Sequence, residues 1–162
     1  MTNDTSAAAP RRRLSLLWAL LLLCAGCATP GGAQGSAAAA AAPRGTLFER
    51  LGGMAAIEAV VDDLFARVAV DPKLNASFAG APIPRTRRRL IELVCQLSGG
   101  PCHYSGRDMK AVHAGMGVTS AQFDALAGHL VEALDRFKVP EREKSELLSL
   151  VAPTKADIVE EP

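Results

Sequence analysis

The sequence predicts an all-α domain that begins near Thr46. Three observations support this fold class: apolar residues recur at helical spacing, capping-box motifs precede two helical segments, and strand-like alternation is absent from position 46 onward. The chain has 162 residues, of which 49% are hydrophobic and 22% charged, and its formal net charge is +1. This composition excludes a disordered chain and a polyanion-binding surface, and it suffices for one hydrophobic core.

The first two predicted helices lie between positions 46 and 71. Thr46 and Glu49 have the capping-box spacing, which predicts a short helix that stops at Gly52 and Gly53. A longer helix follows and is expected to end at Asp71, before a proline. Its buried face is predicted from an apolar stripe that consists of Ile57, Val60, Val61, Leu64, Phe65 and Val68.

Two further helices are predicted, after Pro84 and after Thr119. The apolar residues of the first helix are expected to face the core: Leu90, Ile91, Val94 and Leu97. Its arginines are expected to be mostly solvated: Arg85, Arg87, Arg88 and Arg89. The second begins at the capping box of Thr119 and Gln122, and its buried face should contain Phe123, Leu126, Ala127, Leu130, Val131, Leu134 and Phe137. The carboxylates expected on solvated helix faces are Asp62, Asp63 and Glu92.

Residues 1–27 have the features of a bacterial export signal. Arginines at positions 11–13 precede an apolar run that ends at Cys24 and is too short to span a bilayer comfortably. Small residues before Cys27 are similar to a lipoprotein lipobox, although Cys24 stands where leucine is usual. We therefore expect cleavage before Cys27, lipidation of this cysteine, and a membrane-anchored domain on the periplasmic side of the cell envelope. The alternatives are cleavage between Ala33 and Gln34 and an uncleaved anchor. Residues 28–45 are expected to form a linker rich in Ala, Gly and Pro.

His113 is the candidate metal ligand. It lies on a short apolar turn between Val112 and Ala114, shortly before the helix that begins after Thr119. A neutral imidazole is a common axial ligand of haem iron, and one histidine suffices when a porphyrin supplies the other four nitrogens. On spacing alone, a half-buried histidine with a structural role is the more common occurrence.

Several short motifs along the chain match those of one protein family in order and spacing, and no gap is needed to align them. They are residues 47–53 (LFERLGG), 60–63 (VVDD), 77–80 (SFAG), 99–101 (GGP), 104–106 (YSG), 109–110 (MK), 112–113 (VH) and 128–130 (GHL). Together they make the segment from Thr46 to Val159 resemble a group 1 truncated haemoglobin of the bacterial globin family. The resemblance implies a two-over-two helical sandwich over residues 46–159, with residues 160–162 as a tail. It also implies one noncovalent haem b.

The resemblance assigns expected haem contacts residue by residue. His113 is expected to ligate the iron, Phe78 to pack on the haem face, and Arg89 to neutralise a propionate. The other expected contacts are Phe65, Thr86, Leu90, Val94, Met109, Val112, Val118, Phe123 and Leu130. Ordinary core packing is the alternative for each apolar residue, and a solvated face is the alternative for Arg89.

The distal side departs from the family pattern. Family members commonly have tyrosine at the position of Phe65 and often glutamine at that of Leu90, and both would donate hydrogen bonds to bound oxygen. Thr86 offers a hydroxyl, but its short side chain can bond to its own helix instead. A hydrogen bond to a charged group contributes roughly 1.5–3 kcal/mol, so oxygen should dissociate about tenfold to a hundredfold faster here. Carbon monoxide and nitric oxide should then be relatively favoured.

The other cysteines and histidines of the predicted domain have no expected role in binding haem. Cys95 and Cys102 can form a disulfide in an oxidising compartment, or Cys95 can be a small buried hydrophobic residue. His129 is expected to have a structural role or to lie at the surface. His103 does not belong to a covalent haem-attachment motif, because Gly99 stands where that motif requires a cysteine.

The leading predicted function is reversible binding of oxygen, nitric oxide or carbon monoxide at the haem. A haem redox enzyme, such as a nitric oxide dioxygenase or a peroxidase, is an alternative that would need an electron donor such as a reductase. A haem-free envelope lipoprotein that serves as an interaction module is a third possibility. No nucleic-acid partner is expected, since the arginines lack interleaved aromatic residues, and no hydrolytic motif is recognisable.

Overall fold

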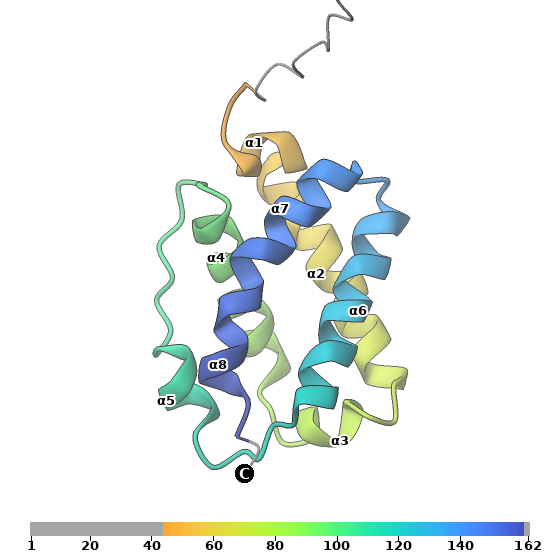
Figure 1. The fold of residues 1–162 in the computed structure, drawn as a ribbon, viewed down its shortest axis with the longest axis vertical. Helices are drawn as coiled ribbons and strands as arrows, with labels where there is room; N and C mark the ends of the chain where they lie inside the picture. The colour runs from red at the N-terminus through yellow and green to blue at the C-terminus, as the bar shows by residue number, and fades with distance from the viewer. Residues whose placement is uncertain (1–43, 161–162) are drawn as a thin grey trace, which may run out of the picture. The chain divides into compact units, whose positions relative to one another are not determined.

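The computed structural model describes residues 44–160 (Figure 1). The predicted signal peptide, Cys27 and nearly all of the predicted linker lie outside the described residues. Within the described part of the chain, no helix is long and apolar enough to cross a membrane.

All regular elements of residues 44–160 are helical. In chain order they are α1 (Leu47–Leu51), α2 (Gly53–Val70), α3 (Asn75–Phe78), α4 (Ile83–Leu97), α5 (Met109–His113), α6 (Ser120–Arg136), α7 (Glu141–Val151), the 3-10 turn η1 (Ala152–Thr154) and α8 (Lys155–Ile158).

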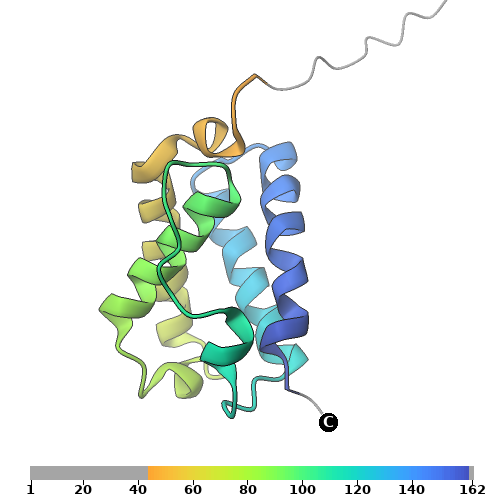
Figure 2. The same ribbon diagram turned by 90° about the vertical axis from the view of Figure 1, so that its left-hand side faces the viewer.

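The four longest helices form two packed pairs. α2 packs against both α4 and α6, and α7 contacts α4 and α6 on the other side of the core (Figures 1 and 2). The short α5 lies beside α8 at one end of this arrangement. The predicted all-α, two-over-two sandwich is confirmed.

Both predicted capping boxes are present. The Thr46 hydroxyl accepts the backbone N–H of Glu49 at 3.2 Å, and the Glu49 carboxylate accepts the backbone N–H of Thr46 at 2.9 Å. Thr119 and Gln122 make the equivalent pair of bonds at 3.2 and 3.0 Å. These bonds satisfy backbone donors that have no partner inside the helix, so they fix where α1 and α6 begin.

Two predictions about side-chain burial, one on α2 and one just after α6, are wrong. Phe137 was expected inside, but it follows the last residue of α6 and is 44% exposed, because the chain turns there at Lys138, whose φ is 57°. Asp63 was expected in solvent, but it is only 7% exposed. Its carboxylate accepts a hydrogen bond from Arg67 Nε at 2.7 Å and another from Arg136. Arg67 first, and then Arg136, lower the pKa of Asp63, which keeps this buried charge paired.

An ion pair links α6 to the end of α2. His129 Nε2 lies 2.7 Å from a carboxylate oxygen of Asp71, and Nδ1 lies 3.3 Å from Glu132. The hydrogen bond to Asp71 raises the pKa of His129, and Glu132 acts in the same direction. His129 therefore has the structural role that the sequence analysis allowed.

We expect His129→Gln to destabilise the domain more in mild acid than in base. Because the pKa of His129 is higher in the folded chain, the pair stabilises fully below the unfolded value of 6.5. This contribution is lost as the pH rises through the folded-state pKa. Thermal unfolding should show a melting temperature about 2–4 °C below wild type near pH 5.5, and little difference near pH 9.

The exposed His103 provides the matched control, since His103→Gln removes the same ring without removing a contact of the described residues. Equal destabilisation by His129→Gln at both pH values would show that packing, and not charge, accounts for the effect.

Candidate functional site

His113 is the last residue of α5. The Asp108 carboxylate caps this helix by accepting the backbone N–H of Ala111 at 2.8 Å. His113 is half-buried, and its Nδ1 lies 2.8 Å from the carbonyl oxygen of Met109, one turn earlier. This bond takes up one ring nitrogen, and no hydrogen bond within residues 44–160 engages Nε2. Nε2 is therefore the nitrogen that remains for a metal ion.

The surroundings of His113 set a condition on any such metal. Among residues 44–160, no group of three or more His, Cys, Asp or Glu side chains lies close enough together to hold an ion. An iron ion on His113 would therefore take most of its ligands from a cofactor. A porphyrin supplies four nitrogens, so the single histidine fits haem chemistry.

An apolar cavity of about 80 Å³ lies between the two helix pairs. Four of the predicted haem contacts line it: Leu90 and Val94 from α4, and Phe123 and Leu130 from α6. Its volume suits a small apolar molecule such as a diatomic gas, and a porphyrin would need more room. These four residues are thus brought together around an apolar space.

The predicted distal residues offer no free polar donor. Phe65 and Phe78, from α2 and α3, pack edge to face with their ring centroids 6.1 Å apart. The Thr86 hydroxyl donates to the carbonyl oxygen of Pro82, one turn earlier, at 3.4 Å. Thr86 therefore uses the local backbone bond that the sequence analysis considered, and Leu90 adds only an aliphatic side chain.

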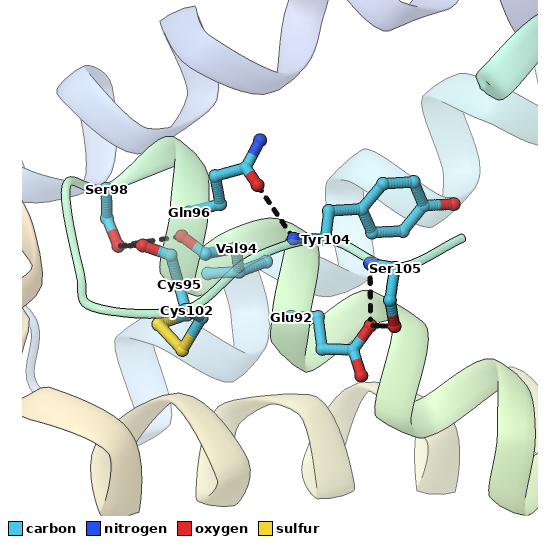
Figure 3. Close-up of a disulfide and its surroundings, with 8 residues drawn as sticks. All are labelled: Glu92, Val94, Cys95, Gln96, Ser98, Cys102, Tyr104 and Ser105. Carbon is cyan, nitrogen blue, oxygen red and sulfur yellow. Dashed lines mark hydrogen bonds between the residues drawn. A yellow bond between two sulfur atoms is a disulfide. The ribbon is translucent and has the colours of Figure 1, made fainter. Parts of the chain in front are cut away.

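A disulfide begins the connection between α4 and α5. Cys95, which is fully buried, bonds to Cys102, and their Cα atoms lie 5.8 Å apart (Figure 3). The backbone at Gly100 passes so close that an added Cβ would lie 2.6 Å from Cys95 Sγ and 2.5 Å from the Phe48 ring. The glycine is thus required by this close approach. Of the two roles considered for Cys95, the structure has the disulfide.

Hydrogen bonds continue the connection along α4 (Figures 2 and 3). The backbone N–H of Tyr104 donates to the side chain of Gln96 at 2.7 Å, and that of Ser105 donates to Glu92 at 3.2 Å. Arg89 also donates to the Ser105 hydroxyl. The segment therefore runs antiparallel to α4, towards its beginning. We name the disulfide and these bonds the α4 tether, which holds the connection against α4 from Cys95 back to Arg89, shortly before α5 begins.

The α4 tether corrects the solvated position expected for Glu92. Its carboxylate is half-buried, and the backbone N–H and then the hydroxyl of Ser105 lower the pKa of Glu92. Arg89 Nη1 donates to Glu92 at 2.8 Å as well as to Ser105. Arg89 is thus half-buried and held in place by one nitrogen, while the rest of its guanidinium remains for an anion.

The proximal residues lie on α5 and on the loop after it. Met109 and Val112 are half-buried on α5, and Val118 is half-buried at the end of residues 114–118, which we name the proximal loop. Sequence reasoning missed one residue here. Glu160, assigned to the tail, bonds to this loop through its backbone and its carboxylate. No local motif marks it, because its partners lie more than forty positions away in the chain.

Comparisons with known proteins cover the same residues. The model of the family "Bacterial-like globin" matches residues 46–160. The group 1 truncated haemoglobin of Mycolicibacterium paratuberculosis is 37% identical over 113 residues, which cover 70% of this chain and 83% of that protein. The corresponding protein of a Nostoc species is 43% identical over 89 residues, 55% of this chain and 75% of its own length.

Solved structures agree with the helix arrangement. Ferric truncated haemoglobin from Tetrahymena pyriformis is similar with a TM-score of 0.69 and 26% identity, covering 72% of this chain and all of the other. The 2/2 haemoglobin of a Synechococcus species, with covalently attached haem, has a TM-score of 0.67 and 26% identity over 71% of this chain and 98% of its own. Family match, sequence identity and helix order lead to one conclusion: the chain belongs to the bacterial-like globin family, and its relatives include group 1 truncated haemoglobins.

Proposed function

We propose that this globin binds one haem b noncovalently through His113 and reversibly binds a diatomic gas. The observation that carries the proposal is the arrangement of the His113 ring. Its Nδ1 faces the Met109 carbonyl oxygen at 2.8 Å, which favours the tautomer with the proton on Nδ1 and an unprotonated Nε2. The haem, when bound, supplies an iron with one coordination position left for the gas.

The other residues supply a pocket of matching chemistry. Leu90, Val94, Phe123 and Leu130 exclude water from the side of the haem that they contact, because they line an apolar cavity. The guanidinium of Arg89 has nitrogens beyond Nη1 with which to meet a propionate. Met109, Val112 and Val118 would pack on the histidine side, and Phe78 on the haem face.

We expect the full chain, reconstituted with haem, to give a stoichiometric Soret band that depends on His113. His113→Gly should lose the band. Added imidazole should restore it, because imidazole can enter the space left by the side chain and supply the missing nitrogen. Absorption spectra of the ferric form, and of the dithionite-reduced form with carbon monoxide, measure this. His103→Gly is the matched control, since His103 is exposed and outside the site.

A wild-type chain without specific haem uptake would contradict the proposal. The interaction-module function would then be preferred. A normal Soret band with rapid turnover of nitric oxide or peroxide in the presence of a reductant would instead favour the redox enzyme.

The lack of a distal donor leads to weak oxygen retention. Phe65, Leu90 and Thr86 offer bound oxygen no free hydrogen-bond donor, since the Thr86 hydroxyl already faces the Pro82 carbonyl. Carbon monoxide and nitric oxide depend less on such a donor. Retention of the physiological gas therefore depends more on the apolar pocket than on a hydrogen bond from the protein.

We expect Phe65→Tyr to slow oxygen dissociation about tenfold to a hundredfold, the effect of one hydrogen bond of roughly 1.5–3 kcal/mol. Stopped-flow displacement of oxygen by carbon monoxide measures the rate. Phe137→Tyr adds the same hydroxyl at an exposed position and should leave the rate unchanged. A wild-type rate as slow as that of Phe65→Tyr would mean that Thr86 or a water already donates.

We also propose that the domain is held at the periplasmic side of a membrane by a lipid on Cys27. The Cys95–Cys102 disulfide supports an oxidising compartment, because structural disulfides persist there and are rare in the cytosol. The lipobox-like residues before Cys27 support the anchor. Residues 28–45 would then separate the globin from the membrane surface.

We expect Cys27→Ser to move the globin from the membrane fraction to the soluble fraction of bacterial cells, because it removes the lipidated thiol. Cys24→Leu is the matched control: it removes the other thiol of this segment, introduces the residue usual at that lipobox position, and should leave the protein in the membrane. Immunoblotting of the two fractions, with acyl labelling, gives the result. A soluble wild-type protein would favour cleavage between Ala33 and Gln34, and a membrane-bound Cys27→Ser protein would favour an uncleaved anchor.

A further inference from the structure

We propose that Glu160 is a positioning residue for His113, because it holds the proximal loop in one conformation. The inference rests on the proposed role of His113 as the iron ligand. Glu160 lies after the last helix, more than forty positions along the chain from the loop that it contacts. Its hydrogen bonds reach His113 through the backbone that follows it, and its charge also interacts with the His113 side chain.

The carboxylate of Glu160 accepts two backbone hydrogen bonds from the proximal loop. The N–H of Gly115 donates to Oε1 at 2.8 Å, and the N–H of Gly117 donates to Oε2 at 2.8 Å. The backbone N–H of Glu160 donates to the carbonyl oxygen of Val118 at 2.9 Å. One residue thus makes three bonds across the loop, and two of them are charge-assisted.

The two glycines give the loop the backbone conformation that these bonds require. Gly115 has a φ of 76° and Gly117 a φ of 62°, a region that side chains disfavour. A Cβ added at either position would meet no atom within 4 Å. The glycines are therefore explained by backbone conformation and not by lack of space. That conformation turns alternate N–H groups towards one carboxylate, as in other backbone anion sites.

The loop is joined directly to His113. The backbone N–H of Met116 donates to the carbonyl oxygen of His113 at 3.0 Å. The ring nitrogen Nδ1 faces Met109 in the same five-residue helix. Movement of residues 115–117 would therefore change the direction of the His113 backbone and of its ring. Glu160, which follows α8, holds the loop through Gly115 and Gly117 and so limits this movement.

The test compares Glu160→Gln with Asp157→Asn in the full chain reconstituted with haem. Glutamine keeps one acceptor oxygen but places an NH₂ group against the second backbone N–H. Asp157 is exposed on α8, and among residues 44–160 it has no hydrogen-bond partner, so its variant removes the same charge from the same segment without removing these bonds. Haem transfer to an excess of apomyoglobin measures haem loss. Resonance Raman spectra of the ferrous protein measure the iron–histidine stretching band.

Glu160→Gln should lose haem about five- to tenfold faster, the size of one ordinary hydrogen bond, because solvent weakens a charge-assisted bond at this exposed site. Its iron–histidine band should shift or broaden, and Asp157→Asn should match wild type in both measurements. Amide hydrogen exchange of the haem-free chain should be faster at residues 115–117 in Glu160→Gln alone, which reports on the loop without haem.

Wild-type haem loss and a wild-type band in Glu160→Gln would overturn the inference, as would equal changes in both variants, which would indicate a charge effect. Failure of the proposed function looks different. It appears as a wild-type chain without a Soret band, and it would overturn the positioning role together with the ligand assignment of His113.

Discussion

The site depends on a helix that cannot hold its own position. α5 has five residues, and an isolated helix shorter than about 12–15 residues is marginal in water. Contacts on both sides must therefore place it. The α4 tether acts before α5, and the bonds between Glu160 and the proximal loop act after it. Most of these contacts use backbone groups or side chains outside α5, so the side chains of the helix itself stay available for a ligand.

Paired charges fix how the longer helices meet. Asp63 on α2 accepts from Arg136 at the end of α6, and Arg50 on α1 donates to the buried Glu143 on α7 at 3.1 Å. Removing two charges from water costs much of what their attraction returns, so such pairs contribute little net stability. Apolar helix faces alone would allow several relative positions. We therefore interpret these pairs as selecting one helix arrangement among those that the apolar core allows.

The long helices could be predicted from the sequence because many apolar residues repeat at one spacing in each. The starts of α1 and α6 were predictable too, since a capping box is local. Phe137 shows where this reasoning fails: its spacing continues the α6 pattern, but the helix ends one residue earlier. Asp63 was misplaced because its burial reflects the packing of α2 against α6, which carries its distant partner Arg136, and the local partner Arg67 does not reveal that packing. Glu160 could not be found because its partners are likewise distant in the chain.

The two sides of the candidate site therefore rest on different physics. The predicted distal residues Phe65, Thr86 and Leu90 lie on the long helices α2 and α4, whose positions follow from apolar burial distributed over many residues. Exchanging Phe65 or Leu90 for a polar residue changes the chemistry offered to a gas while most of that burial stays. The proximal side is placed by the packing of α5 against α8, a few polar bonds and one disulfide. We expect the loss of one of these polar bonds to affect the position of His113 more than the folding of the domain. Ligand preference and haem attachment can thus vary separately in this fold.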